Sequence, residues 1–266
     1  MLCYNLKELN ALEVKPKVML KSGCYVIDKT TGGLKKGGIH LIAGASGHRK
    51  SFTLLHMALL MSQDNDVIYF SLENDLEEDK TRIDQACKLY NLPINNERFN
   101  YLKLSYEDDI DSIYKVLKCN KDFVVFIDGT EFCVGGDTGA GMFASGKSFM
   151  ENLMRIAEDN DHTFILSWQL CRGVDKIKIE DISFDHLSTS MSAVRIAYTI
   201  WAVKTDYTNY ITDMILLKSR GMVYSERKAW ALCNKDREFY IKGTDANLDV
   251  LNKIMENRDK LTLNKK

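Results

Sequence analysis

The chain has 266 residues, of which 45% are hydrophobic and 27% charged, so it can bury a substantial core in one large domain. Its formal net charge is −1 at pH 7, so the field of the whole molecule does not attract nucleic acid, and any such contact must come from local basic loops. No apolar run is long enough to cross a bilayer, and seven cysteines without a C-x-x-C pair favour reduced thiols, so we expect a cytoplasmic protein without membrane contact.

Apolar, β-branched runs alternate with amphipathic stretches along most of the chain. The expected strands are 38–43, 67–72, 123–128 and 163–168, and the expected helices are 51–62, 76–90 and 148–159. After residue 195 the pattern changes to short strands at 197–203, 213–218, 228–233 and 238–242. These patterns predict an α/β fold, with a mostly parallel twisted sheet flanked by helices and extended by C-terminal antiparallel strands. We expect an N-terminal helix and linker over 1–20, one core over 21–245, and a C-terminal helix and tail over 246–266.

Two segments resemble the phosphate-binding pattern G-x-x-x-x-G-K-[ST]. GMFASGKS at 141–148 fits it at every position, whereas GASGHRKS at 44–51 has Arg49 in place of the second glycine. A phosphate loop needs a buried strand before it and a helix after it, because the loop amides and the helix N-terminus together face the anion. Only 44–51 has that context. We therefore assign nucleotide binding to 44–51 and expect 141–148 to be a mobile loop that ends in a helix start.

The assigned loop has a role for each of its polar side chains. Lys50 would reach the β- and γ-phosphates, and the hydroxyl of Ser51 would coordinate magnesium. Arg49 is sterically possible if its φ is negative, and it would then add a cation beside the phosphates. The alternative is a decayed loop that no longer binds nucleotide. The expected nucleotide-binding residues are Gly44, Ala45, Ser46, Gly47, His48, Arg49, Lys50 and Ser51.

Three further expected strands lead to polar side chains at the same edge of the sheet. Glu73 is placed to deprotonate the attacking water, and Asp128 to hold the magnesium shell. Gln169 is suited to sensing the γ-phosphate. Each residue alone is readily explained as a helix cap or a solvated loop residue. Because ligands of open α/β sheets lie at this carboxyl edge, their shared order predicts an ATP hydrolase that uses Mg²⁺.

In their order along the chain, these segments resemble the motor domain of the DnaB-type (superfamily 4) replicative DNA helicases. GGLKKGGIHLIAGASGHRKS is similar to the family's first motif, FSLEND to its "FSLEM", FVVFID to its Walker B strand, LSWQLCRG to its "LSQLNR", and KSRG at 218–221 to its "KxR". The resemblance covers about residues 24–242. It implies a RecA-like P-loop NTPase core that forms rings, usually hexamers, around single-stranded DNA during DNA replication. By the same resemblance, Lys218 and Arg220 would reach the neighbouring subunit's ATP as sensor and arginine finger.

The resemblance also implies DNA-contacting loops at the ring centre. The candidates are Lys147, in the segment after Asp128, and Arg172, Lys176 and Lys178, in the segment after Gln169. Replicative helicases carry an N-terminal domain or a primase before the motor, where about 20 residues precede the core here, so a separate primase or helicase loader is an expected partner. Arg49 and a weakly matching fourth motif at 184–201 are compatible with a divergent, phage-encoded protein in a host cytoplasm.

Three functions stay open at this point. The first is an ATP-driven, ring-forming translocase or helicase on single-stranded DNA. The second is a RecA-like recombinase or recombination mediator, which the "FSLE" and "KxR" strings disfavour. The third is a degenerate ATP-binding module that builds an assembly without turnover, against which the full set of site residues argues.

Overall fold

The computed structural model describes residues 17–93, 96–104, 110–133, 140–171, 173–187, 191–207, 211–220 and 230–231. At the centre of this part of the chain is an eight-stranded sheet with the order β10-β9-β8-β3-β7-β6-β4-β5. The strands from β8 to β5 in that order run parallel to their neighbours, which confirms the predicted mostly parallel sheet. The strand bounds are Ile39–Gly44 (β3), Val67–Ser71 (β4), Phe99–Lys103 (β5), Val124–Asp128 (β6), Thr163–Gln169 (β7), Thr199–Asp206 (β8), Ile211–Ser219 (β9) and Trp230–Ala231 (β10).

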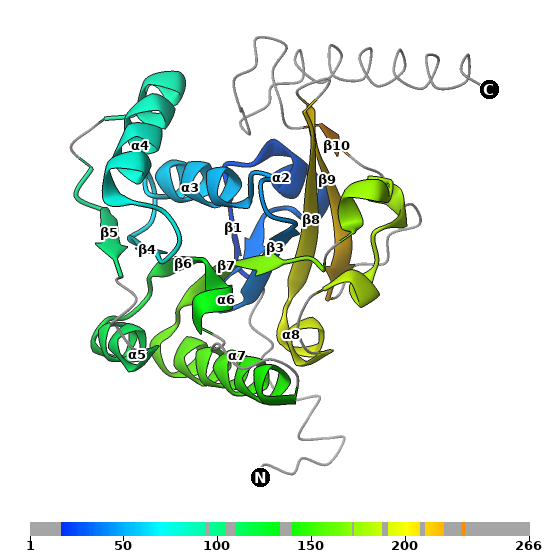
Figure 1. The fold of residues 1–266 in the computed structure, drawn as a ribbon. Helices are drawn as coiled ribbons and strands as arrows, with labels where there is room; N and C mark the ends of the chain where they lie inside the picture. The colour runs from blue at the N-terminus through cyan, green and yellow to red at the C-terminus, as the bar shows by residue number, and fades with distance from the viewer. Residues whose placement is uncertain are drawn as a thin grey trace, which may run out of the picture.

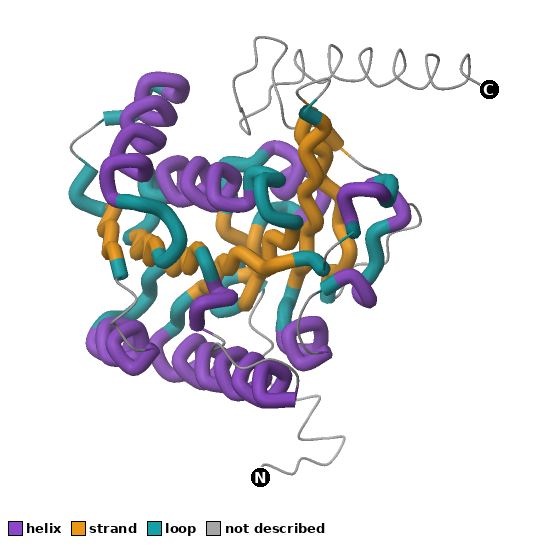
Figure 2. Tube along the Cα trace, viewed as in Figure 1, coloured by secondary structure: helices purple, strands orange, loops and turns teal. Residues whose placement is uncertain are grey.

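Helices cover both faces of the sheet, so the molecule has three layers (Figures 1 and 2). Helices α2, α3 and α4 pack on one face, and α5, α7 and α8 pack on the other. Successive side chains of a strand point to opposite faces, so Leu41 joins one apolar core and Ile42 the other. The helix bounds are Tyr25–Thr31 (α2), Lys50–Met61 (α3), Leu76–Tyr90 (α4), Ile110–Cys119 (α5), Thr130–Cys133 (α6), Ala140–Asn160 (α7) and Met191–Ile196 (α8).

The C-terminal strands extend the sheet in the antiparallel sense, as predicted. β9 pairs antiparallel with β8, and β10 pairs antiparallel with β9. The segment after β7 contains three short 3-10 helices, η1 (Val174–Lys176), η2 (Ile179–Asp181) and η3 (Phe184–His186). A small antiparallel pair, β1 (Met19–Leu20) and β2 (Leu34–Lys35), precedes the main sheet. The strand expected at 238–242, the C-terminal helix and residues 1–16 lie outside the described residues.

The segment GMFASGKS is not the loop that its sequence suggested. Residues 141–148 lie within α7, which begins at Ala140. Beyond its first turn, a helix uses its amides for hydrogen bonds to carbonyls four residues earlier. Gly146 and Lys147 therefore cannot form a loop that wraps a phosphate in this fold.

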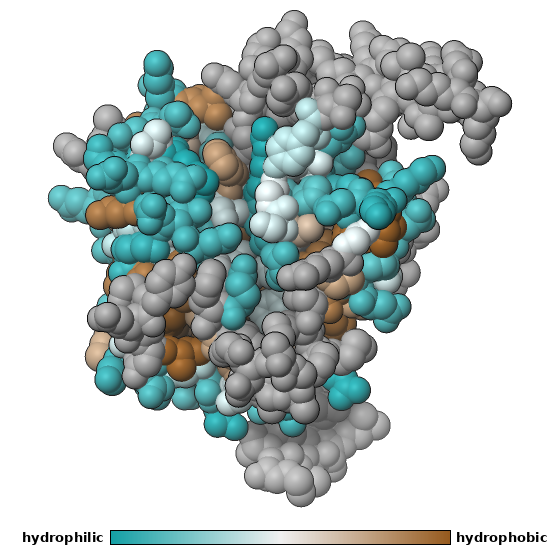
Figure 3. Space-filling model, in the orientation of Figure 1, coloured by the Kyte–Doolittle hydropathy of each residue, from teal (hydrophilic) through white to brown (hydrophobic). Residues whose placement is uncertain are grey.

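The described surface is consistent with α4 facing solvent. In the space-filling view of Figure 3, hydrophilic side chains dominate the surface of α4, and hydrophobic side chains show elsewhere as separate patches. None of the helices in the described ranges has the length and apolar character that a bilayer crossing requires.

Candidate functional site

The assigned phosphate loop connects β3 to α3. β3 ends at Gly44 and α3 begins at Lys50, so the loop has the strand and helix context that the motif requires. The Lys50 ammonium donates hydrogen bonds to the carbonyl oxygen of Ala45, at 3.2 Å, and to Gln169 Oε1, at 2.9 Å. Burial lowers the pKa of Lys50, while nearby carboxylates oppose that shift. The cation is thus held at the loop, where phosphate oxygens could replace its two present acceptors.

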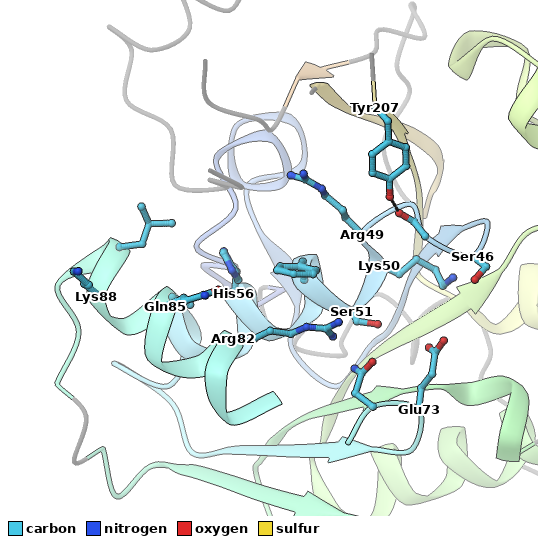
Figure 4. A pocket seen from close by; sticks show the side chains of 15 residues that line it. Ser46, Arg49, Lys50, Ser51, His56, Glu73, Arg82, Gln85, Lys88 and Tyr207 are labelled. Carbon is cyan, nitrogen blue, oxygen red and sulfur yellow. Dashed lines mark hydrogen bonds between the residues drawn. The ribbon is translucent and has the colours of Figure 1, made fainter. Parts of the chain in front are cut away.

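Arg49 adopts the backbone conformation of the glycine that it replaces. Its φ is 61° and its ψ is 27°, so the negative φ under which arginine was expected to fit is not found. A Cβ in this left-handed region approaches the following carbonyl oxygen and costs about 1–2 kcal/mol. Figure 4 shows the Arg49 side chain directed away from Lys50 and Ser51. The expected second cation is therefore not beside the lysine in this structure.

A cavity of about 1110 Å³ opens beside the loop, between α3 and α4. Lys50, Ser51 and Glu73 all line it, and Figure 4 shows their side chains directed toward a common space. Small-molecule sites typically measure about 300–1,000 Å³, so a nucleoside triphosphate has room here. Arg82 of α4 forms the far wall with its guanidinium 4.6 Å from the centroid of the Phe52 ring.

Asp128 lies at the end of β6, fully buried. Its Oδ2 accepts a hydrogen bond from the Tyr69 hydroxyl at 3.1 Å, whereas its Oδ1 is buried without a hydrogen-bond partner among the described residues. Burial raises the pKa of Asp128 to about 6, and the hydroxyl of Ser51 is the largest influence in the opposite direction. An unpaired buried carboxylate oxygen beside a serine hydroxyl fits the oxygen ligands that Mg²⁺ prefers. Ser51 and Asp128 are therefore the residues here that could hold the ion.

Strand register brings the remaining predicted groups to the same edge. Gly44 pairs with Gln169 across β3 and β7, and Ser71 pairs with Asp128 across β4 and β6. Glu73 lies two residues beyond Ser71, so it follows the neighbouring strand into the cavity. The structure therefore brings the loop, Glu73, Asp128 and Gln169 together, as the sequence order suggested.

Glu131, which the sequence analysis did not single out, also belongs to this site. It lies on α6, three residues after Asp128, and its Oε2 is buried without a hydrogen-bond partner in the described part of the chain. Burial raises its pKa, and the charge of Lys50 opposes that shift. The available signal was the carboxylate in IDGTEF directly after the Walker B strand.

The loop is also tied to β8 and to the segment after β7. The Tyr207 hydroxyl donates to the carbonyl oxygen of Gly47. The backbone amide of Thr205 donates to His48 Nδ1 at 2.8 Å, so Nε2 carries the ring proton and donates to Asp175 Oδ1 at 2.7 Å. No sequence motif announces these contacts, because their partners are far apart in the chain.

Lys218 and Arg220 lie together at the end of β9. The Lys218 ammonium donates to the carbonyl oxygens of Val194, Arg195 and Ala197, and the Arg220 guanidinium also donates to that of Arg195. Both cations therefore cap the C-terminus of α8, where the helix dipole favours positive charge. Burial lowers the pKa of Lys218 to about 8, and the charge of Arg220 lowers it further.

The expected DNA-contacting residues lie on two different elements. Lys147 is exposed on α7 and pairs with Glu151 at 3.8 Å. Lys176 and Lys178 are exposed in the segment after β7, and Arg172 lies outside the described residues. The structure thus leaves three of these cations accessible to an anionic ligand.

Comparison with solved structures shows which fold this is. The chain is similar to a solved helicase ATPase domain, with a TM-score of 0.64 and 18% identity over 84% of this chain and 91% of that chain. It is also similar to a DnaB-like replicative helicase whose structure was determined with its interactions with primase, with a TM-score of 0.66 and 18% identity. This second match covers 85% of this chain and 62% of that one. No family model and no curated protein matches the sequence. The chain therefore has the RecA-like fold of DnaB-like replicative helicase ATPase domains, as the sequence resemblance predicted.

Proposed function

We propose that the chain is the ATP-hydrolysing motor of a ring-forming DNA helicase that translocates on single-stranded DNA during replication. The observation that carries this proposal is the convergence of Lys50, Ser51, Glu73, Asp128 and Gln169 at one sheet edge, in a fold shared with helicase ATPase domains. The buried, unpaired Oδ1 of Asp128 adds support, because an oxygen in that state fits a metal ligand better than a structural acceptor.

The residues divide the work of phosphoryl transfer. Lys50 would exchange Ala45 and Gln169 for phosphate oxygens, which leaves the Gln169 carboxamide free to report the γ-phosphate. Glu73, which is exposed to the cavity, would accept the proton of the attacking water. Mg²⁺ held by Ser51 and Asp128 would neutralise charge on the phosphates.

The partners follow from the same proposal. Exposed Lys176 and Lys178 lie in the segment after Gln169, so a nucleic-acid backbone bound there would lie one short segment from the γ-phosphate sensor. A hexameric ring would place Lys218 and Arg220 of one subunit at its neighbour's ATP. A separate primase or helicase loader remains a proposed partner, as does action in a host cytoplasm.

One observation favours a second candidate, an ATP-binding assembly module without turnover. The left-handed Arg49 places a bulky residue where the motif normally has glycine, next to the catalytic lysine. The intact acids Glu73 and Asp128 argue for hydrolysis instead.

A DNA-stimulated ATPase assay, paired with mass measurement with and without nucleotide, separates these candidates. The motor predicts hydrolysis that rises with single-stranded DNA and a nucleotide-dependent oligomer. Lys50→Ala should abolish ATP binding, whereas Lys147→Ala should leave it unchanged, because Lys147 lies on a helix face. Nucleotide binding without hydrolysis would select the assembly module, and equal losses in both variants would overturn the phosphate-loop assignment.

A further inference from the structure

Tyr69 occupies the centre of a row of aromatic side chains on the α4 side of the sheet. It pairs with Tyr101 of β5 on one side and with Phe126 of β6 on the other. Its ring stacks on Tyr101 at a centroid distance of 6.1 Å and an interplanar angle of 11°, and on Phe126 at 6.2 Å and 24°. The ring is 1% exposed. These two neighbours fix the ring and therefore the direction of its hydroxyl group.

The Tyr69 hydroxyl reaches the carboxylate that ends the adjacent strand. It donates to Asp128 Oδ2 at 3.1 Å, along the pleat from its own pair partner Phe126. A buried phenol needs such an acceptor, and a buried carboxylate needs such a donor. Because Oδ2 is held by this bond, the orientation of the carboxyl group is set, and Oδ1 is the oxygen left without a described partner.

We propose that Tyr69 is a positioning residue for Asp128, which holds Oδ2 so that Oδ1 stays directed to a magnesium ion bound with ATP. This inference rests on the proposed function, because it assigns the tyrosine to the metal site of the nucleotide pocket. A carboxylate that rotates freely would offer its oxygens to the ion in many orientations. The hydroxyl bond removes that freedom before the ion arrives.

Tyr101 provides a matched control within the same aromatic row. Its hydroxyl donates to Asp79 Oδ2 at 2.9 Å, and the Ser71 hydroxyl donates to the same oxygen at 2.5 Å. Asp79 belongs to α4 and is 1% exposed, so this second carboxylate is a structural partner of the sheet. Removing either phenol hydroxyl deletes one buried hydrogen bond, but only the Tyr69 bond touches Asp128.

The test compares Tyr69→Phe and Tyr101→Phe by their affinity for a non-hydrolysable ATP analogue, measured with Mg²⁺ and with EDTA. We expect Tyr69→Phe to keep its affinity in EDTA and to lose about tenfold or more of the affinity gained with Mg²⁺, as loss of a ligand's orienting partner typically does. Tyr101→Phe should keep both values. With Mn²⁺ in place of Mg²⁺, the electron paramagnetic resonance spectrum of the bound ion should change only in Tyr69→Phe.

Three results would overturn the inference. Tyr69→Phe could retain the full magnesium effect, or it could lose affinity equally in EDTA, which would indicate a structural role only. If the wild-type chain binds the analogue but gains nothing from Mg²⁺, the metal assignment fails and the inference with it. Absence of wild-type binding in both conditions would instead reject the proposed function.

A second variant keeps the test decisive if Tyr69→Phe does not fold. Asp128→Asn removes the buried charge that the phenylalanine would leave unpaired. In that background, Tyr69→Phe should leave both affinities unchanged, because no carboxylate remains to be oriented. A further loss of the magnesium effect in the double variant would show that Tyr69 acts through another group.

Discussion

At position 49 the phosphate loop keeps a glycine conformation although the residue is arginine. The carbonyl oxygen of Arg49 accepts hydrogen bonds from the backbone amide of Thr53, at 3.0 Å, and from its side-chain hydroxyl, at 2.9 Å. These bonds begin α3, so the helix start holds the residue at a positive φ. The strain is therefore maintained by the element that presents Lys50 and Ser51.

Arg49→Gly and Arg49→Ala should separate the backbone strain from the positive charge. Both variants remove the cation, but only glycine removes the Cβ. We expect Arg49→Gly to exceed Arg49→Ala in free energy of unfolding by about 1 kcal/mol, measured by urea denaturation. An equal or greater stability of Arg49→Ala would show that the loop does not hold this conformation in solution. If the arginine cation assists ATP binding, both variants should lose affinity equally.

Glu73 and Glu131 are two carboxylates near Lys50, and their exposure assigns them different roles. Glu73 lines the described cavity and can meet water, whereas Glu131 has a buried oxygen and is absent from that lining. We expect Glu73→Gln to bind ATP and to lose about two to four orders of magnitude in turnover, as removal of a general base does. Glu131→Gln, its isosteric control, should stay within about tenfold of the wild-type rate. The reverse pattern in single-turnover kinetics would transfer the role of base to Glu131.

At the scale of elements, the sequence predicts those parts of the fold that have strong local patterns. The four buried strands β3, β4, β6 and β7 are continuous apolar runs, because both of their faces are covered by helices. β5 was missed because it is a half-exposed edge strand, FNYLK, with no such run. The helix over 141–148 was missed because the match to the phosphate motif and the preceding glycines favoured a loop.

The same distinction applies to the site. Glu73, Asp128 and Gln169 were predictable because the ends of parallel strands meet at one edge of the sheet. His48 and Asp175 were not paired in advance, because they are 127 residues apart and neither belongs to a motif role that names the other. Contacts of this kind depend on side-chain packing between elements, which periodicity does not report.

The contact between His48 and Asp175 joins the phosphate loop to the segment that carries Lys176 and Lys178. Lys204 of β8 holds the same segment, with its ammonium donating to the carbonyl oxygens of Val174, Asp175 and Ile177. The segment 173–177 is therefore attached both to β8 and to the loop that would change its contacts when ATP binds.

We expect Asp175→Ala to release residues 173–187 from the phosphate loop. Backbone amides of that segment should then exchange hydrogen faster, and His48→Ala should have the same effect. The double variant should show no further increase, because the two side chains form one contact. Asp181→Ala, in the same segment but outside this contact, is the control. Additive effects in a hydrogen-exchange experiment would mean that His48 and Asp175 act independently.

At the scale of the whole molecule, buried histidines and one buried aspartate give folding stability an opposed dependence on pH. Burial lowers the pKa of His40 to about 4 and that of His56 to about 3. The unfolded chain therefore binds protons at these sites first, and the free energy of unfolding falls as the pH drops below about 6.5. Asp128, whose pKa burial raises to about 6, binds its proton first in the folded state and opposes that loss.

Denaturant unfolding between pH 7 and pH 4.5 should thus show decreasing stability, by up to about 1.4 kcal/mol per pH unit for each histidine. Asp128→Asn should make the decrease steeper below pH 6, because it removes the one opposing group named here. A wild-type stability that does not change over this range, or a shallower decrease in Asp128→Asn, would contradict the assignment.

The assembly proposal depends on what Lys218 and Arg220 do outside a single chain. In this structure both cations cap α8 through its last carbonyl oxygens. To reach a neighbour's ATP, Arg220 must give up its bond to Arg195, which lies on the exposed surface. The loss of one exposed hydrogen bond is small compared with the charge stabilisation that a guanidinium gives to a transferring phosphoryl group.

Arg220→Ala should therefore bind ATP almost normally and hydrolyse it about 10³-fold more slowly. Mixing shows where the arginine acts. In rings that contain both Arg220→Ala and Lys50→Ala subunits, an intact pocket next to an intact finger should recover activity that neither variant has alone. Such recovery also shows that Arg220→Ala folds, because its own pocket does the hydrolysis. A finger that acts within its own subunit gives no recovery, once native mass spectrometry has verified subunit exchange. Full activity from a chain shown to be monomeric would remove both the action in trans and the ring.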